Sequence, residues 1–361
     1  MKLRKRVFFC YRQLVTFSKV IRREINTFTP MPLEARLKMW SKGFFSASWF
    51  RYEFYLGKNK EYDYVSDLQE NLRASRVTLP SYTKYVDDKV IFPLFFANLC
   101  PVVHNYAFIL NNRLLPLSKS LIINSPDNLL TLLSSGQDIV IKPVEGSLGS
   151  HVHKLYFKND EGFFWNGKHI ERDDLIKKLS NLNFNIICPW IKQAKYAEKF
   201  YPFTTNTVRI LTVIDPETNE AFVAHSVQRI GTKRSFPVDN FHAGGISCHI
   251  DSNTGIIGKG SYMYPVESCK TWYSHHPETG EVIEGVQIPH WDNIITSILR
   301  VANSVSFLKI IGWDLIVLDN QEHGFVLLEG NDGADFKVHQ IHGGFLKDKK
   351  IRDAMKGYNI I

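Results

Sequence analysis

The chain has 361 residues, of which 44% are hydrophobic and 13% aromatic, and it carries a formal net charge of +8. This composition excludes a disordered or fibrous protein and supplies enough apolar side chains for roughly two or three subdomains. The positive charge favours anionic partners such as nucleotides, acidic glycans or anionic lipid, without choosing among them. Nucleic-acid binding ranks last, because no RNA or DNA motif supports it.

Cysteine usage and the apolar segments predict a cytoplasmic protein. The five cysteines are scattered without a CxxC pair, which favours a reduced compartment. Charges at Arg12, Lys19 and Arg22 interrupt any apolar core of a secretory signal. The most hydrophobic run, residues 91–103, is shorter than the roughly 18 apolar residues that span a bilayer. The basic N-terminal stretch is either an ordinary packed helix or a peripheral anchor at the inner face of the membrane.

The first part of the chain favours helices. Residues 1–75 contain few glycines and many Lys, Arg, Glu and Leu residues, and the prolines of "NTFTPMP" predict a break with a new helix after it. We interpret this part as a helical accessory segment. Further on, Ser125–Gly136 has a Ser-Pro start, a leucine-rich turn and a closing glycine, which predict a short helix.

Strand patterns dominate from residue 138 onward. They are "DIVIKPV", "HVHKLYF", "FNIICPWI", "NTVRILTVID", "EAFVAHSVQRI", "GISCHID", "GWDLIVLD" and "GFVLLEGN". The interleaved helical patterns are few, chiefly "RDDLIKKLSNL" and "WDNIITSILRVANSV". This mixture predicts an α+β protein with antiparallel sheets and not a doubly wound parallel sheet.

A glycine-rich loop lies within "KPVEGSLGSHVHK", residues 142–154. It lacks the GxxxxGK[ST] pattern and a strand follows it, so it must bind phosphate as a hairpin if it binds phosphate at all. Gly146 and Gly149 allow positive φ, so consecutive amides can point at one anion. Ser147 or Ser150 can add a hydroxyl group, and Lys142 adds a cation. A flexible surface hairpin would have the same sequence, and both interpretations stay open here.

A second pattern, "GWDLIVLDNQEHGFVLLEGN", predicts two strands joined by a turn near Gln321. In the simplest hairpin register Asp314 pairs with Glu329, and Asn331 lies on the same face as Glu329. Two opposed carboxylates repel each other unless a cation lies between them, which indicates a divalent metal. Oxygen ligands of this kind suit Mg²⁺. The alternative is an exposed carboxylate face whose charges are hydrated.

The order of these segments resembles that of ATP-grasp enzymes. A lysine with a Gly-Ser-rich hairpin, the hinge-like "NIICPWIKQ", the arginine-bearing "TNTVRILTV" and a closing "GWDLIV…LLEGN" follow one another. More narrowly, "VDNFHAGGISCHIDSNTG", "HPETGEVIEGVQIPHW" and "LLEGND…HQIHGG" resemble the sugar-transfer-associated ATP-grasp proteins found near surface-polysaccharide biosynthesis genes. The resemblance covers residues 87–344 and leaves out the N-terminal helical segment.

The resemblance implies a division into four parts. Residues 1–75 are the N-terminal helical accessory segment, and residues 76–130 the N-terminal ATP-grasp subdomain. Residues 131–192 are the central lid subdomain with the glycine-rich loop, and residues 193–361 the C-terminal subdomain with the metal site.

The resemblance also assigns the nucleotide site. Lys142 would contact the α- and β-phosphates of ATP, and the 146–150 loop would close over the triphosphate as a lid. Lys89 would be the upstream nucleotide-binding lysine, with a solvated lysine at the start of a helix as the alternative. The hinge formed by Pro189, Trp190 and Ile191 would hold adenine between apolar side chains while its main chain binds the edge of the base.

The remaining site residues follow from the same resemblance. The magnesium ligands would be Asp314, Glu329 and Asn331. Arg209 would stabilise charge on the transferring phosphoryl group, with a surface arginine on an edge strand as the alternative. Arg229 and Lys233 are weaker candidates for binding an anionic acceptor. His242 is ambiguous, as a polar neighbour of the loop at residues 244–245 or as a base near the acceptor.

The implied activity is that of an ADP-forming carboxylate-amine ligase that uses ATP and Mg²⁺ and passes through an acyl phosphate. We expect an amide between an amino acid or amine and a uronic acid, in the assembly of capsular or other surface polysaccharide. The alternatives are an ATP-dependent phosphotransferase that acts on a sugar and a non-catalytic nucleotide-binding module. The acid, the amine and the oligomeric state do not follow from these residues.

Overall fold

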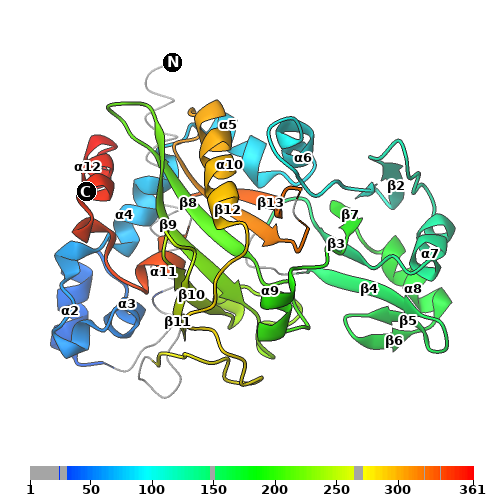
Figure 1. The fold of residues 1–361 in the computed structure, drawn as a ribbon, viewed down its shortest axis with the longest axis horizontal. Coiled ribbons are helices and arrows are strands. Elements are labelled where there is room, and N and C mark those ends of the chain that lie inside the picture. Colours follow the sequence, from blue (N-terminus) through cyan, green and yellow to red (C-terminus); the bar gives the residue numbers. More distant parts are fainter. Residues whose placement is uncertain (1–23, 25–30, 147–150, 264–270, 321, 334) are drawn as a thin grey trace.

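A computed structural model of the chain shows two antiparallel sheets that lie side by side, with helices around them (Figure 1). It describes residue 24 and residues 31–146, 151–263, 271–320, 322–333 and 335–361. Every strand pairing within the two sheets is antiparallel. The predicted α+β class with antiparallel sheets is confirmed.

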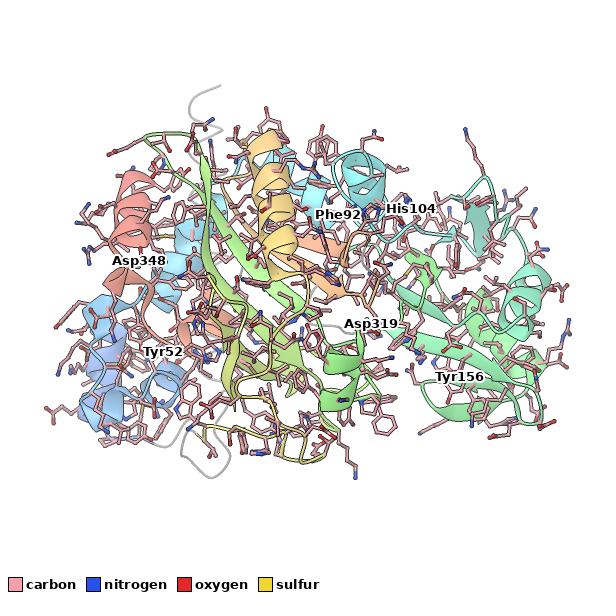
Figure 2. All side chains as sticks on the ribbon, in the orientation of Figure 1. Tyr52, Phe92, His104, Tyr156, Asp319 and Asp348 are labelled. Carbon is pink, nitrogen blue, oxygen red and sulfur yellow. The ribbon has the colours of Figure 1, made fainter. Side chains whose placement is uncertain are left out.

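Short helices form the described part of the N-terminal segment. They are α2 (Leu33–Ser41), α3 (Ser46–Arg51) and α4 (Asp67–Leu72), with 3-10 turns at Phe54–Leu56, Glu61–Asp63 and Ala74–Arg76. A capping box starts α4, since the Ser66 side chain accepts from the Gln69 amide and the Gln69 side chain accepts from the Ser66 amide. Tyr52, labelled in Figure 2, stacks on Tyr64 at 4.6 Å between ring centroids. This small aromatic core holds the helices and turns of the segment together.

Two helices connect this segment to the first strands. They are α5 (Pro80–Asp87) and α6 (Ile91–Phe96). The apolar run that begins at residue 91 enters the protein core, where Phe96 meets the Trp313 ring edge-on at 5.5 Å between centroids. Among the described residues, no helix combines the length and the apolar character needed to cross a bilayer.

The seven-stranded sheet forms one half of the molecule. Its strands, in spatial order, are β2 (Arg113–Pro116), β1 (Ala107–Leu110), β7 (Asn185–Pro189), β3 (Ile139–Pro143), β4 (His153–Lys158), β5 (Gly162–Trp165) and β6 (Lys168–Ile170). Helices α7 (Pro126–Ser134) and α8 (Arg172–Ser180) bury their leucines against it. Because β1 pairs with β7, strands on both sides of the division expected at residue 130 belong to this one sheet.

Helix α7 begins and ends as its sequence predicts. The Ser125 hydroxyl accepts a hydrogen bond from the Asn128 amide, and Pro126 occupies the first turn, where no amide donor is needed. Gly136 closes the helix with a φ of 89°, a value that favours glycine.

The six-stranded sheet forms the other half. Its strands, in spatial order, are β11 (Ile257–Tyr262), β10 (Ile246–Ile250), β9 (Ala221–Ile230), β8 (Val208–Ile214), β12 (Ile310–Val317) and β13 (Phe325–Asp332). Short helices flank the strands at α9 (Lys195–Phe200), α11 (Phe336–Gln340) and the 3-10 turns Phe241–Ala243 and Phe345–Lys347.

Helices cover both faces of this sheet. Helix α10 (Trp291–Ser304) places Ile294, Ile298 and Val301 in the core formed with Val208 and Ile210 of β8. Helix α12 (Lys349–Gly357) packs on the opposite face with Leu211 and Val213 of the same strand. Full burial of each such aliphatic side chain is worth about 1.5–3 kcal/mol, so β8 and β12 are firmly held at the centre of the molecule. The charged residues that these two strands carry are therefore fixed in position.

Candidate active site

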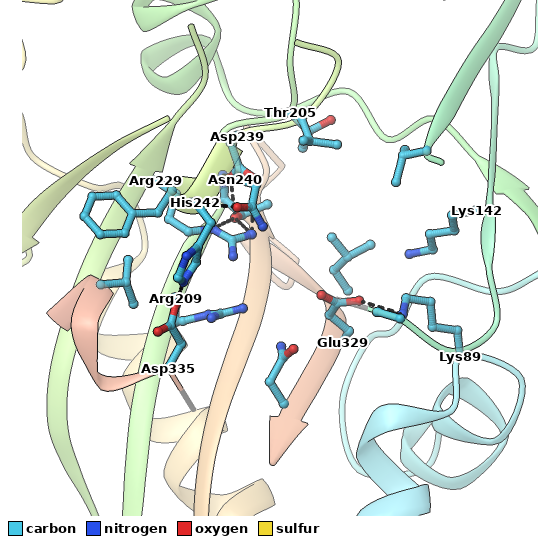
Figure 3. A pocket seen from close by; sticks show the side chains of 18 of the residues that line it. Lys89, Lys142, Thr205, Arg209, Arg229, Asp239, Asn240, His242, Glu329 and Asp335 are labelled. Atoms are coloured by element: carbon cyan, nitrogen blue, oxygen red, sulfur yellow. Dashed lines mark hydrogen bonds and ion pairs between the residues drawn. The ribbon is translucent and has the colours of Figure 1, made fainter. Parts of the chain in front are cut away.

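A cleft of about 410 Å³ lies where the two sheets meet. The seven-stranded sheet lines it with Val140, Lys142, Cys188 and Pro189, and the six-stranded sheet lines it with Arg209, Arg229, Ile316, Leu328, Glu329 and Asn331. Its two ends carry different cations (Figure 3). We call the region of Lys89, Lys142 and Glu329 the lysine end. The arginine end comprises Arg209, Arg229, Asp314, His242 and Asp335.

The β12–β13 hairpin pairs Asp314 with Glu329, as its sequence predicts. The register nearer the turn differs, because Val317 pairs with Phe325 and not with Val326. A bulge next to Asp314 absorbs this one-residue difference. Glu329 and Asn331 line the cleft together.

Two arginines balance the charge of Asp314. The Arg209 Nε and Nη2 atoms donate to the two carboxylate oxygens at 2.6 and 2.7 Å, and Arg229 Nη2 lies 3.2 Å from Oδ2. Burial would raise the pKa of Asp314, but the charges of Arg209 and Arg229 outweigh it and hold the pKa below its usual value. Asp314 therefore already has two cations beside it, and its pairing with Glu329 does not by itself require a metal ion.

The second arginine is anchored from several sides. Arg229 Nε and Nη2 donate to the Thr207 hydroxyl at 3.0 and 2.7 Å, and Nη2 also donates to Asp239 at 3.2 Å. Asp239 in turn accepts from the amide and the hydroxyl of Thr207 at 2.8 and 2.6 Å. Every hydrogen-bonding partner in this network is buried, so the two guanidinium groups are fixed before any ligand binds.

The lysines are held far more loosely. Lys142 is buried on β3, and among the described residues its ammonium group has no hydrogen-bond or ion-pair partner. It points into the cleft (Figure 3). Lys89 Nζ lies 3.6 Å from Glu329 Oε2 and 3.2 Å from the Gly146 carbonyl oxygen, so it faces the cleft and is not a solvated surface lysine. These two ammonium groups suit the binding of phosphate oxygens.

The glycine-rich loop joins β3 to β4 as a hairpin, as expected. Gly146 has a φ of 131°, which a glycine adopts without strain. The other loop residues assigned to nucleotide binding, Ser147, Gly149 and Ser150, lie outside the described residues. Their role as a lid stays a prediction.

The hinge after β7 lines the cleft with Pro189, Trp190 and Ile191. The Trp190 amide donates to the Asp138 carbonyl oxygen at 3.0 Å and is therefore not available to an adenine edge. The Trp190 ring lies 3.9 Å from Lys154 Nζ, measured to its centroid. Apolar side chains surround this part of the cleft from both sheets, namely Val140, Cys188, Ile316 and Leu328. The cleft therefore has apolar walls beside the hinge, while the Trp190 amide is used within the protein and Pro189 has no amide hydrogen to donate.

Charged residues of the cleft that were not predicted from the sequence include Glu70, Lys337 and Asp335, and their pairings were not predicted either. Glu70 comes from α4 in the N-terminal segment, pairs with the buried Lys337 ammonium and accepts from the Phe336 amide at 2.8 Å. Burial raises the pKa of Glu70 despite the nearby charge of Lys337. His242 Nε2 lies 2.7 Å from Asp335 Oδ2. No sequence spacing indicates either pair, because the partners are far apart along the chain.

The three residues expected to bind magnesium are Asp314, Glu329 and Asn331, and they differ in how well their side-chain atoms suit this ion. Glu329 is partly exposed to the cleft, and the Asn331 side-chain amide nitrogen is buried without a partner among the described residues. The Glu329 carboxylate and the Asn331 carbonyl oxygen are ligands of the kind that Mg²⁺ takes, whereas the unpartnered Asn331 nitrogen is a donor that suits an acceptor such as a phosphate oxygen. Asp314 fits less well, since both of its oxygens accept from guanidinium groups. The described residues contain no group of three His, Cys, Asp or Glu side chains that could hold a metal.

Two antiparallel sheets with a lysine-bearing cleft between them are what the resemblance to ATP-grasp proteins implies. A family model described as sugar-transfer associated ATP-grasp matches residues 74–352, and the chain belongs to this family. The α4 helix with Glu70 lies before the matched residues. No protein with a curated description matches the chain.

Solved structures of ATP-grasp ligases are among those similar to the chain. One is "ATP-grasp ligase PsnB complexed with minimal precursor", with 14% identity and a TM-score of 0.40 over 79% of this chain and 64% of that one. D-cycloserine synthetase DcsG has 10% identity and a TM-score of 0.41 over 79% and 74%. D-alanyl-alanine synthetase A from Vibrio cholerae has 13% identity and a TM-score of 0.39 over 75% and 65%. The chain thus spans just under two thirds of the length of the first.

Proposed function

We propose that this protein is an ATP-dependent, ADP-forming ligase that joins a carboxylate to an amine through an acyl phosphate. The observation that carries the proposal is the division of the cleft. Two loosely held ammonium groups lie at one end, two fully paired guanidinium groups lie at the other, and a carboxylate and an amide face the space between them. A triphosphate bound at the lysine end directs its terminal phosphate toward the arginine end.

The first half of the reaction transfers a phosphoryl group. The substrate carboxylate attacks the γ-phosphorus, the bond to the β-phosphate oxygen breaks, and ADP leaves. Lys142 and Lys89 bind the phosphates, and Arg209 lies where charge develops on the transferring group. Glu329 and Asn331 would hold Mg²⁺, which supplies further charge neutralisation to the phosphates when bound.

The second half forms the amide. An amine attacks the carbonyl carbon of the acyl phosphate, and inorganic phosphate leaves. An acyl phosphate is lost to hydrolysis if water reaches it, so the 146–150 loop is proposed to act as a lid over the phosphates. The apolar slot of Val140, Ile316 and Leu328 is proposed to hold adenine.

The substrate class that we propose is supported by the family description and the charge of the chain. A family associated with sugar transfer, together with the net charge of +8, supports a uronic acid as the carboxylate and an amino acid or amine as the nucleophile. The product would belong to capsular or other surface polysaccharide. We place the reaction in the cytoplasm, where the basic N-terminal segment could hold the enzyme at the inner face of the membrane.

The proposal is tested with hydroxylamine as a general amine. The purified chain is incubated with ATP, Mg²⁺ and one acid at a time, from glucuronic and galacturonic acids and their uridine diphosphate derivatives. Acids that give a hydroxamate with equal amounts of ADP and free phosphate are then paired with the common amino acids, and the product mass is measured. Turnover that requires both the acid and the amine supports the ligase.

Other results would contradict this function in specific ways. ADP without free phosphate, with an acid or sugar that gains the mass of a phosphoryl group, would identify a phosphotransferase. Retained ATP binding without turnover of any acid would leave a non-catalytic nucleotide-binding module.

A further inference from the structure

We propose that His242, oriented by Asp335, is the base that removes the proton from the attacking amine. This inference rests on the proposed function and concerns only its second half. No sequence pattern or comparison assigns the pair, and the two residues belong to different parts of the C-terminal half of the chain. His242 lies on the 3-10 turn Phe241–Ala243 after β9, and Asp335 immediately precedes α11.

The backbone holds both residues in place. The Asn240 side chain accepts from the amides of His242 and Ala243 at 2.8 and 3.1 Å, which fixes the turn that carries the imidazole. Asp335 adopts a φ of 43°, in the left-handed region that a residue with a side chain seldom occupies. Its amide donates to the Gly333 carbonyl oxygen at 2.6 Å. Strained backbone of this kind is kept where the surroundings fix a side chain for a task.

The hydrogen bond between the two side chains selects the tautomer of the imidazole. His242 Nε2 lies 2.7 Å from Asp335 Oδ2. Although burial opposes ionisation, the adjacent His242 holds the pKa of Asp335 well below its usual value, so the carboxylate is ionised and can only accept. Nε2 therefore carries the hydrogen, and the lone pair of the neutral ring lies on Nδ1. A ring oriented by a carboxylate in this way is suited to take up a proton.

The cationic side chains nearest to His242 and Asp335 are already held in ion pairs. Arg209 is paired with Asp314, and Arg229 with Asp239 and Asp314. Lys337 is paired with Glu70 and lies 4.0 Å from Asp335 Oδ1. The Asp335 carboxylate therefore lies between the Lys337 ammonium group and the His242 imidazole, and it orients the ring. The ring itself is partly exposed and lines the cleft.

The position of the pair matches the second half of the reaction. His242 and Asp335 lie at the arginine end, on the far side of Glu329 from Lys89 and Lys142 (Figure 3). As the amine nitrogen forms its bond to the carbonyl carbon, the bond between that carbon and the phosphate oxygen breaks and phosphate leaves with the electron pair. A protonated amine first gives one proton to Nδ1 of His242 and attacks as the neutral form, and the second proton that its nitrogen loses goes to the departing phosphate.

A structural role for the same pair is the competing explanation, since the contact also ties the 3-10 turn to the start of α11. The variant His242→Gln separates the two roles, because its side-chain amide can still donate to Asp335 but cannot take up a proton. Hydroxylamine separates them again, since it is a neutral nucleophile near neutral pH and needs little help from a base. An amino acid, whose amine is protonated there, depends on one.

The experiment uses the full chain with the uronic acid that gives a hydroxamate and the amino acid that gives an amide. We expect His242→Gln to lower kcat for amide formation by about 10²- to 10⁴-fold, while hydroxamate formation falls by less than about tenfold. His323→Gln, which changes an exposed histidine away from the cleft, is the matched control and should match the unmodified protein in both assays.

Each outcome decides between the explanations. Equal loss of hydroxamate and amide in His242→Gln would mean that the residue only supports the structure, and unchanged amide formation would remove it from the mechanism. Either result overturns the base assignment while the ligase itself stands. If the unmodified protein forms no product with any acid, the proposed function fails and this inference fails with it.

Discussion

The two ends of the cleft hold their cations in opposite ways. At the lysine end, Lys142 has no side-chain partner among the described residues and Lys89 reaches Glu329 only at 3.6 Å. At the arginine end, Arg209 makes two hydrogen bonds to a carboxylate that has no exposed surface. An ammonium group without a partner can bind an anion directly, whereas a guanidinium group that is already paired has a fixed position in the lining of the cleft. Substitutions at the lysine end should therefore change ATP binding and turnover. Substitutions at the arginine end should also lower the stability of the fold.

The largest effect is expected at Glu329, the carboxylate of the lysine end. Glu329→Gln keeps the shape of the side chain but removes its charge, and it should lower ATP-dependent turnover by about 10³-fold or more. The free energy of unfolding should change little, because the ion pair of Glu329 with Lys89 is long and a glutamine can keep the side-chain hydrogen bond to Asp314.

Product formation and chemical unfolding measure the two effects of this substitution. Glu284→Gln, which removes a similarly long ion pair to Lys259 away from the cleft, is the matched control. A fully active Glu329→Gln protein would remove this residue from the proposed metal site.

The second-largest effect is a loss of stability at the arginine end. Arg209→Met leaves Asp314 buried without its two strongest hydrogen bonds, and it should lower the free energy of unfolding by about 3–5 kcal/mol. The double variant Arg209→Met, Asp314→Asn should recover part of this loss, because the uncompensated charge is then gone.

Urea unfolding of the single and double variants measures the coupling between the two side chains. Lys349→Met, which breaks an exposed ion pair with Asp353, is the comparison and should leave unfolding unchanged. If Arg209→Met loses no more unfolding free energy than Lys349→Met, the paired guanidinium group of Arg209 does not contribute to the stability of the fold.

A smaller effect is expected for the unpaired lysine. Lys142→Met should raise KM for ATP by about 10- to 100-fold, the value of one hydrogen bond to a charged group. Its unfolding free energy should not fall, because no described residue loses an ion-pair partner. Lys168→Met, on an exposed edge strand of the same sheet, is the control for ATP titrations followed by turnover. A destabilised Lys142→Met protein with normal KM would assign the lysine to the structure of the sheet.

The smallest effect concerns two histidines beside the arginine end. His225 and His339 are in contact through their Nδ1 atoms at 3.2 Å, and neither has a carboxylate partner of the kind that His242 has. Burial, with a contribution from His249, lowers the pKa of His225 to about 3, and burial likewise holds the pKa of His339 well below its usual value. Both rings therefore stay neutral in the folded protein.

The sign of the pH dependence follows from these lowered values. Below about pH 6.5 the unfolded chain takes up protons that the folded protein does not, so stability is lost as the pH falls. Between pH 6.5 and 5 each histidine should cost roughly 2 kcal/mol. In His225→Gln this part of the loss should disappear, while His323→Gln should keep it. Unfolding curves at the two pH values measure the difference, and equal slopes in His225→Gln and the unmodified protein would contradict the prediction.

Local patterns predicted a large part of the fold. The eight strand patterns after residue 138 and the three helix patterns all lie on observed strands and helices, because alternation, caps and turn residues act over a few positions. The pairing of Asp314 with Glu329 was predictable for the same reason, since the two strands follow each other closely in the chain. Short strands were missed, among them β1, whose pairing with β7 depends on residues far away in sequence.

In the candidate site, too, local features were predictable from the sequence and contacts between distant residues were not. The sequence alone determined that acidic, basic and amide side chains alternate along buried strands, and that a glycine-rich hairpin begins beside Lys142. Only the tertiary structure decided which charges meet. Asp314 is balanced by Arg209 because β8 lies next to β12, and the Trp190 amide is occupied because Asp138 lies across from it. Glu70 reaches the cleft because α4 packs on α11. A buried charge is governed by its neighbours in space, and those are set by strand order and packing.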